Sequence, residues 1–256
     1  MRVSGKVVVV TGGGSGIGAG LAARFSQDGA AAVIVADIDL EAATGVAERI
    51  GGHGLQVDVA SDGSNRLLIE DVEANFGPIA LFCANAGIAR EGDEQSPDDE
   101  WDLMWSINFK SHVFAARHLI PLWIERGGGY LLVTASAAGL LTNIGAAQYS
   151  VTKHAAVAFA EWLAITYGER GVKVSCLCPQ GVRTPMLEQA GKLAEMLAID
   201  ALSPEEVAAA VISGLEAERF LILPHPEVAD FLIRKASDRD GWIAAMQRLQ
   251  NRLGLS

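Results

Sequence analysis

The segment Val7–Gly20, "VVVVTGGGSGIGAG", joins four valines to a run of glycines near the start of this chain of 256 residues. The valines predict a buried strand, and the "LAARFSQDG" that follows has the pattern of a helix. Glycines at such a junction allow a tight turn and let backbone N–H groups approach a pyrophosphate at the positive end of the helix dipole. The segment therefore predicts a dinucleotide-binding loop, with contacts from Gly12, Gly14, Ser15, Gly16, Ile17 and Gly18.

Short runs rich in β-branched residues recur along the whole chain, with longer helical patterns between them. Apolar strands without alternation are buried on both faces, which requires a parallel sheet with helices above and below it. The sequence therefore predicts an α/β fold, a single-domain Rossmann fold over residues 1–256 with a doubly wound, mainly parallel seven-stranded sheet. The predicted strands lie in 6–11, 31–37, 54–59, 79–87, 129–136, 171–179 and 219–224.

Asp37 ends the second predicted strand, 19 residues after Gly18. At this spacing a carboxylate can accept hydrogen bonds from both hydroxyl groups of an adenosine ribose. A 2′-phosphate would meet like charge at Asp37, and neither Ser15 nor Ile38 offers a compensating cation, so the sequence favours NAD over NADP. The alternative is that Asp37 only caps the next helix, since Asp is a good N-cap and Asp39 lies close behind.

Tyr149 and Lys153 stand four residues apart in "AAQYSVTKHAAVAFAEWLA", a largely apolar helical pattern. At this spacing they project from the same face of a helix. A nearby ammonium group favours a phenolate and is expected to lower the phenol pKa, which suits Tyr149 for general acid–base chemistry on an alcohol or ketone oxygen. Ser136 follows the fifth predicted strand and could hold that oxygen. Taken singly, each residue could instead be an amphipathic cover, a snorkelling lysine or a cap.

Composition excludes several other classes of function. The formal net charge of −11 and the pI of about 4.9 disfavour binding to nucleic acid or to an anionic membrane surface. Cys83, Cys176 and Cys178 lie in apolar runs without ligand partners at metal spacing, so we expect reduced thiols and no metal site. No apolar run reaches membrane-spanning length, and the N-terminus lacks a signal-peptide core, so a cytoplasmic location is expected.

The ordered series of motifs resembles the short-chain dehydrogenase/reductase family over about residues 4 to 224. The family's TGxxxGxG pattern stands at Thr11–Gly18, its YxxxK pair is Tyr149 and Lys153, and its serine is Ser136. The remaining matches are Asp58-Val59, Asn85-Ala86-Gly87, Asn108 in "SINFK", and the segment Pro179-Gln180-Gly181-Val182-Arg183-Thr184.

The resemblance implies roles for these positions. Asp58 would bind the adenine amino group with Val59 beside it, and Asn85, Ala86 and Gly87 would border the ribose. Asn108 would be a fourth catalytic residue, through which a water links Lys153 to solvent. Lys153 would also bind the nicotinamide ribose and Tyr149 would lie against the cofactor. The carboxamide would be held by Val182 and Thr184 within a loop that includes Pro179 and Gly181, where Gln180 departs from the family's usual Pro-Gly motif.

The implied activity is NAD-dependent hydride transfer between a secondary alcohol and a ketone. A substrate lid is expected at about 185–205, where Met186 and Leu187 favour a hydrophobic substrate and Asn143 and Gln148 could supply polar contacts. Such apolar residues could equally serve packing or a subunit contact. Residues 225–256 read as an amphipathic helical tail, and a homodimer or homotetramer is expected from the family.

Two alternatives remain open. A 3-oxoacyl-acyl-carrier-protein ketoreductase would use NADPH and a basic patch, which Asp37 and the acidic composition disfavour. A non-catalytic dinucleotide sensor would keep the glycine loop but lose Asn108, Ser136, Tyr149 and Lys153, all of which are present.

Overall fold

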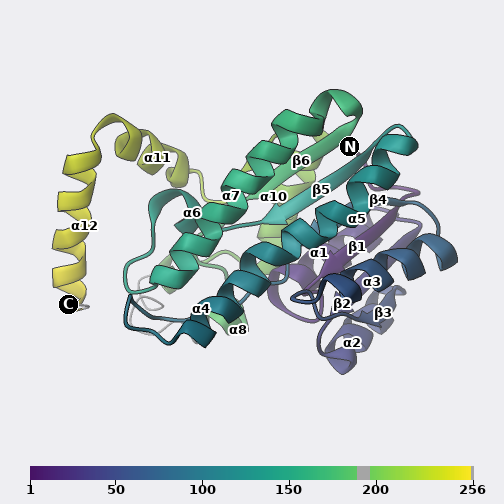
Figure 1. The fold of residues 1–256 in the computed structure, drawn as a ribbon, viewed down its shortest axis with the longest axis horizontal. Helices are drawn as coiled ribbons and strands as arrows, with labels where there is room; N and C mark the ends of the chain where they lie inside the picture. The colour runs from purple at the N-terminus through teal and green to yellow at the C-terminus, as the bar shows by residue number, and fades with distance from the viewer. Residues whose placement is uncertain (189–196, 255–256) are drawn as a thin grey trace.

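The computed structural model describes residues 1–188 and 197–254. Its seven strands form one parallel sheet in the order β3-β2-β1-β4-β5-β6-β7, as the sequence predicts (Figure 1). The strands are β1 (Val7–Thr11), β2 (Ala32–Asp37), β3 (His53–Gln56), β4 (Ile79–Ala84), β5 (Gly129–Thr134), β6 (Val172–Leu177) and β7 (Leu221–Ile222).

The side chains of alternate residues of β1 pack into two separate hydrophobic cores. Val7 and Val9 belong to one buried cluster, and Val8 and Val10 belong to the other. Burial of each such side chain stabilises the fold by about 1.5–3 kcal/mol. The first core is closed by α3 (Asp62–Asn75), α5 (Ser111–Glu125) and α7 (Ala147–Tyr167), and the second by α1 (Gly16–Gln27), α2 (Leu40–Ile50) and α10 (Pro204–Glu216).

The order of the strands reverses between β1 and β4, because the chain first moves outward through β2 and β3 and then returns to the other side of β1. In open parallel sheets the ligand crevice lies at this switch point, outside the carboxyl ends of the strands. Predicted strand 54–59 is shifted: the ladder of β3 stops at Gln56, and Val57 already belongs to the loop toward α3.

Short helices surround the carboxyl ends of the strands. They are α4 (Asp98–Trp105), the π-helix η1 (Ser106–Lys110), α6 (Ala138–Leu141) and α8 (Pro185–Glu188), while the 3₁₀ turn η2 (Gly168–Arg170) leads from α7 into β6. Helix α10 starts with a capping box in which Ser203 and Glu206 bond each other's main-chain N–H groups.

The tail forms two helices rather than one, α11 (Glu227–Ser237) and α12 (Arg239–Leu253). Asp238 separates them because its carboxylate accepts from the Gly241 N–H at 2.9 Å and caps α12. Figure 1 shows α12, in yellow, at the far end of the molecule from α2 and α3. Among the described residues, no helix has the length and apolar character needed to cross a membrane.

Candidate active site

Two glycines of the loop after β1 lie too close to neighbouring backbone to be replaced by residues with a side chain. A Cβ atom on Gly18 would lie 2.0 Å from the main-chain oxygen of Gly12, and one on Gly12 would lie 2.8 Å from Ala86 Cα. Gly12 and Gly16 also have positive φ angles, 63° and 50°, which favour glycine. Because α1 starts at Gly16, its N-terminal N–H groups open onto this loop, as an anion site requires.

Thr11 and Asn85 hold the carboxyl ends of β1 and β4 together. The Thr11 hydroxyl donates to the Cys83 oxygen at 3.2 Å and accepts from the Asn85 N–H at 3.0 Å. The Asn85 side-chain amide donates back to the Thr11 oxygen at 3.1 Å. These bonds fix the switch point of the sheet, where Asn85, Ala86 and Gly87 line a cavity.

Asp37 turns its carboxylate toward the glycine loop. Its Oδ2 accepts from the Gly14 N–H at 2.9 Å, and its Oδ1 accepts from the Asp39 N–H at 3.2 Å. The alternative of Asp37 as the cap of α2 is wrong, because the N-cap is Asp39, which accepts from the Ala42 N–H at 3.1 Å. Asp37 and Ile38 line the cavity, whereas Gly14 lies outside its lining and orients the carboxylate.

Asp58 and Val59 follow β3 and are held by polar contacts at the start of α3. The Asn65 side-chain amide, which is buried, donates to the Val59 oxygen at 2.9 Å and to the Ser61 oxygen at 2.8 Å. The Asp58 N–H donates to the Ser64 hydroxyl at 3.1 Å. Both cavity-lining residues therefore sit on a fixed backbone.

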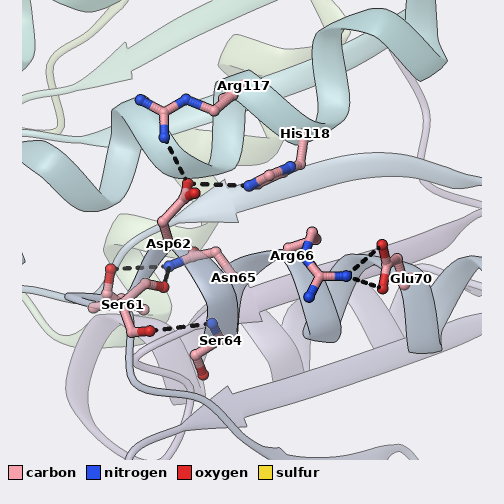
Figure 2. A network of polar contacts seen from close by, with 9 residues as sticks. Ser61, Asp62, Ser64, Asn65, Arg66, Glu70, Arg117 and His118 are labelled. Atoms are coloured by element: carbon pink, nitrogen blue, oxygen red, sulfur yellow. Dashed lines mark hydrogen bonds and ion pairs between the residues drawn. The ribbon is translucent and has the colours of Figure 1, made fainter.

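Figure 2 shows that the same helix end is tied to α5. Asp62 accepts from the Arg117 guanidinium at 2.9 Å and pairs with His118 Nε2 at 3.0 Å. Burial raises the pKa of the Asp62 carboxyl, but the His118 hydrogen bond and the Arg117 charge outweigh it and lower the pKa below its ordinary value. The loop that carries Asp58 is thus anchored between two helices.

Ser136, Tyr149 and Lys153 converge on the same cavity. The Ser136 hydroxyl accepts from the Ala138 N–H at 3.1 Å and lies 3.5 Å from the Pro179 oxygen. Lys153 is buried, and its Nζ donates to the Thr134 oxygen at 3.1 Å and lies 5.6 Å from the centre of the Tyr149 ring. Tyr149 is partly exposed toward the cavity.

Burial dominates the acid–base properties of this pair. Loss of solvation raises the pKa of the Tyr149 phenol, and the contact with the Ser136 hydroxyl lowers it by a smaller amount. Burial also lowers the pKa of Lys153 to about 8. The expectation of a more acidic phenol is therefore not met in the protein alone, because desolvation is the largest influence on the Tyr149 pKa and the hydrogen bond with Ser136 offsets only part of it.

Asn108 lies in the π-helix η1 and is completely buried. Its Oδ1 accepts from the Ile88 N–H at 2.8 Å, and its Nδ2 donates to the Ile88 oxygen at 2.9 Å and lies 3.3 Å from the Thr152 hydroxyl. Both polar atoms of the side chain are thus engaged with the backbone beside Gly87. Asn108 does not line the cavity, although a Cβ on Gly87 would lie within 3.3 Å of both Asn108 Oδ1 and Lys153 Nζ.

The cavity has a volume of about 1150 Å³ and runs along the carboxyl ends of the strands. Of the residues predicted to bind the cofactor, it is lined by all except Gly14. They are Gly12, Ser15, Gly16, Ile17, Gly18, Asp37, Ile38, Asp58, Val59, Asn85, Ala86, Gly87, Tyr149, Lys153, Pro179, Gly181, Val182 and Thr184.

The predicted substrate contacts divide into two groups. Asn143, Met186 and Leu187 line the cavity, whereas Gln148 does not. Gln148 is buried against Gly92, where an added Cβ would lie 2.6 Å from its Oε1. It precedes Tyr149 by one residue, so the helix turns it about 100° away from the Tyr149 side chain. Residues 189–196 of the predicted lid lie outside the described residues.

The tail helices supply a wall of the cavity that the sequence did not predict. The spacing of apolar residues predicts an apolar face on the tail, but it does not show which part of the protein that face contacts. A hydrogen bond of 2.6 Å from the buried Lys235 ammonium group to the Leu140 oxygen fastens α11 to α6. The large apolar side chains that the tail brings to the cavity are Phe231, Trp242, Met246 and Leu249.

Gln180, the departure from the family motif, has separate contacts for its main chain and its side chain. Its N–H donates to His225 Nδ1 at 3.2 Å, and its side-chain amide reaches Glu227 Oε1 at 3.4 Å. His225 lines the cavity and was also missed from the sequence, because a single histidine after a strand of two residues carries no local signal.

The three cysteines are free and buried. Burial raises the pKa of the Cys83 thiol above its ordinary value, so it remains a thiol at neutral pH. Within residues 1–188 and 197–254, no group of three or more His, Cys, Asp or Glu side chains is placed to hold a metal ion.

Comparison with known proteins agrees with this geometry. Residues 6–194 match the family model described as short chain dehydrogenase. The chain belongs to the short chain dehydrogenase family. Enzymes of this family are oxidoreductases that use a nicotinamide dinucleotide, and the present dehydrogenase falls in that class.

Relatives of this short chain dehydrogenase include two bacterial enzymes. The 1-deoxy-11-beta-hydroxypentalenate dehydrogenase of Streptomyces exfoliatus is 32% identical over 89% of the chain and 86% of its own length. The 3beta-hydroxysteroid dehydrogenase 2 of Eggerthella lenta is 32% identical over 71% of the chain and 73% of its own length. A short chain dehydrogenase/reductase from Burkholderia phymatum, solved in complex with NAD, shares the fold with a TM-score of 0.86, 24% identity, and coverage of 94% of this chain and 96% of its own.

Proposed function

We propose that this short chain dehydrogenase catalyses reversible, NAD-dependent hydride transfer between a hydrophobic secondary alcohol and its ketone. The observation that carries the proposal is a single cavity lined by both the glycine loop with Asp37 and the group of Ser136, Tyr149 and Lys153. A dinucleotide site and an acid–base pair that share one cavity are what a dehydrogenase requires.

The residues of the cleft fit a dinucleotide. Side chains at Gly12 and Gly18 would collide with the surrounding backbone, so glycine at these positions permits the tight loop whose main-chain N–H groups could approach a pyrophosphate. The Asp37 carboxylate, oriented by the Gly14 amide, would accept from both ribose hydroxyls and repel a 2′-phosphate. This arrangement supports NAD over NADP.

When bound, NAD supplies the nicotinamide carbon that accepts or donates hydride. In oxidation, the Tyr149 phenolate takes the proton of the substrate hydroxyl on Oη, and in reduction the Tyr149 phenol gives its proton to the carbonyl oxygen and becomes the phenolate. The Ser136 hydroxyl holds the same oxygen by a hydrogen bond. Lys153 carries a positive charge at neutral pH, since its pKa of about 8 lies above 7, and it stabilises the phenolate as it forms.

Asn108 fits the role of a positioning residue. Its side chain clamps the Ile88 backbone, so it would act on the proton path by fixing the segment next to Gly87 and Lys153. Its place in a π-helix supports a functional role, because π-bulges are frequent at functional sites.

The substrate wall favours a hydrophobic, alicyclic alcohol. The cavity is lined both by Phe231, Trp242, Met246 and Leu249 from the tail and by Met186 and Leu187 from the segment after Thr184. A relative named for a 3beta-hydroxysteroid, a ring-bearing secondary alcohol, supports the same class. An acyl-carrier-protein ketoreductase fits less well, because its NADPH would meet Asp37.

A homo-oligomer and a cytoplasmic location belong to the same proposal. Large apolar side chains are exposed on one side of α7, where Trp162 and Ile165 have exposed fractions of 52% and 77%. They continue an aromatic series that runs from Trp105 through Phe109 and Phe159. An exposed apolar patch of this kind supports burial against a second copy of the chain.

The test is NADH formation at 340 nm with a panel of alicyclic secondary alcohols. We expect turnover with the native protein and a loss of about 10²–10⁴-fold in kcat for Tyr149→Phe, the range that general acid–base catalysis contributes, with unchanged NAD affinity. Tyr167→Phe, on the same helix outside the cavity lining, is the matched control. Near-normal turnover of Tyr149→Phe would overturn the assignment, and NAD binding without turnover of any alcohol would favour the sensor.

A further inference from the structure

The hydrogen bonds of the buried Asn108 side chain lead to a residue that has no role so far. Asn108 Oδ1 accepts from the Ile88 N–H, so the other end of the amide is its nitrogen, Nδ2, with two hydrogens to donate. One goes to the Ile88 oxygen at 2.9 Å, and the other goes to Thr152 Oγ1 at 3.3 Å. The Met104 sulfur, at 3.9 Å, is a weaker acceptor than the Thr152 oxygen.

The Thr152 hydroxyl passes this contact on to the helix that carries Tyr149. While it accepts from Asn108, it donates to the main-chain oxygen of Tyr149 at 3.0 Å. One chain of hydrogen bonds therefore runs from the Ile88 backbone through Asn108 and Thr152 to the Tyr149 backbone, and it joins η1 to α7. Thr152 is completely buried and lies outside the cavity lining, so any effect on the reaction is exerted through its neighbours.

Tyr149 stands in the first turn of α7, where support from neighbouring elements matters most. The N–H groups of a first turn have no partner within the helix, and the N-cap residue Ala146 makes no side-chain hydrogen bond to them. Side chains from the next turn supply anchors instead. Lys153 bonds the Thr134 oxygen at the end of β5, and Thr152 bonds Asn108 in η1.

We propose that Thr152 is a positioning residue, which acts through Asn108 to hold the Tyr149 phenol at its place in the cavity. The other end of the chain, Ile88, lines the same cavity, so the bonds fix the phenol relative to that wall. This inference rests on the proposed function, because it concerns the proton transfer assigned to Tyr149. A shift of about 1 Å in such a group can cost about 100-fold in rate.

The experiment compares Thr152→Val, which removes the hydroxyl at nearly constant volume, with Thr152→Ser, which retains it. Thr44→Val makes the same exchange at an exposed position of α2, outside the cavity lining, and is the matched control. Asn108→Ala, alone and combined with Thr152→Val, tests whether Thr152 acts through Asn108. Each protein is assayed with the alcohol that the native protein oxidises fastest, at a temperature below its calorimetric Tm.

We expect Thr152→Val to lower kcat by about 10–100-fold while KM and the Kd of NAD stay within about threefold of native values, as for an interaction needed only in the transition state. Thr152→Ser should restore kcat to within about threefold, and Thr44→Val should match the native protein. In the Asn108→Ala background, the Thr152→Val exchange should change kcat by less than about threefold, because its route is already cut.

A second readout does not require turnover. The ultraviolet absorbance of the phenolate, taken as the difference between each protein and the same protein with Tyr149→Phe, reports the titration of Tyr149. Burial raises the pKa of this phenol. A loosened first turn admits water, so in Thr152→Val the pKa should fall back toward the ordinary value of about 10, whereas Thr152→Ser should titrate as the native protein does.

Three kinetic outcomes would overturn the inference: native kcat in Thr152→Val, an equal loss of kcat in Thr152→Ser, or an undiminished effect of Thr152→Val in the Asn108→Ala background. An unchanged phenol titration in Thr152→Val would overturn it as well. If no alcohol is turned over, the proposed function fails, and the titration alone decides the role of Thr152.

Discussion

Lys153 Nζ donates a hydrogen bond of 3.1 Å to the main-chain oxygen of Thr134, at the end of β5. This bond fixes the ammonium group beneath Tyr149 but leaves it buried, and burial lowers its pKa from an ordinary 10.5 to about 8. A functional constraint, rather than stability, explains a cation at this place.

The burial of Lys153 predicts a stability that rises with pH. Between its folded pKa of about 8 and its unfolded pKa near 10.5, the unfolded chain binds the additional proton. The free energy of unfolding of the native protein, relative to Lys153→Met, should therefore increase by about 2 kcal/mol from pH 7.5 to 9.5. Urea unfolding of both proteins measures this difference, and a flat or falling difference would contradict the burial argument.

His112 predicts a second pH dependence, on the acid side. Its ring is completely buried, and burial together with the Lys153 charge lowers its pKa from 6.5 to about 3. Between these values the unfolded chain again binds the extra proton, so stability is lost as the pH falls below 6.5. The native protein should lose about 2 kcal/mol relative to His112→Leu between pH 7 and pH 5. Parallel stability curves for the two proteins would show that His112 does not titrate in this way.

Asp37 should control the choice between the two dinucleotides. Asp37→Asn keeps an acceptor for the Gly14 N–H but removes the charge, and Ile38→Arg adds a cation for a 2′-phosphate. We expect the ratio of kcat/KM for NADP to that for NAD to rise by about 100-fold in the double variant, as charge-assisted hydrogen bonds imply. Asp39→Asn makes the same charge change at the helix cap and should leave the ratio unaltered; an equal shift there would point to a nonspecific charge effect.

Two glycine substitutions should have opposite effects on thermal stability. Gly18→Ala would place Cβ 2.0 Å from the Gly12 oxygen, so we expect a loss of about 1–3 kcal/mol and of NAD binding. Gly45 lies within α2, and its nearest neighbour to an added Cβ is Arg49 Nη1 at 3.8 Å. Gly45→Ala should therefore raise stability by about 0.5–1 kcal/mol. Calorimetric Tm values report both changes, and a tolerated Gly18→Ala would refute the close packing of the loop.

The exposed side of α7 should control the oligomeric state. Ile165→Lys puts a charge into the proposed contact, so the mass measured by light scattering after gel filtration should fall to that of a smaller assembly. Leu67→Lys introduces the same charge on α3, at a side chain with an exposed fraction of 58%, and should leave the mass unchanged. A monomeric native protein would exclude the oligomer altogether.

The sheet was predictable because each strand can be recognised from its own short stretch of sequence. Continuous β-branched runs such as Val7–Val10 are needed where both faces of a strand are buried, and all seven predicted runs contain strand residues. The convergence of Ser136, Tyr149 and Lys153 was predictable for a related reason. Ser136 follows β5 at the edge of the sheet where ligands bind, and the spacing of four residues places Tyr149 and Lys153 on one face of α7.

The substrate side was not predictable because its residues act through contacts that are distant in sequence. Gln148 lies outside the cavity lining, since a shift of one residue in a helix turns a side chain to another face. His225 is held by a hydrogen bond from the Gln180 N–H, which lies 45 positions earlier in the chain. An apolar face on the tail was evident, but a periodic pattern does not say which surface it covers.

The division of the cavity between two parts of the chain has an evolutionary consequence. The groups proposed to carry out the chemistry follow β1 to β6, whereas Phe231, Trp242, Met246 and Leu249 belong to the last thirty residues and are fastened by contacts such as that of Lys235 with Leu140. Mutations in the tail can therefore accumulate after gene duplication without disturbing hydride transfer. A chimera that carries the tail of a paralogue should inherit the paralogue's choice of alcohol and retain its own catalytic residues.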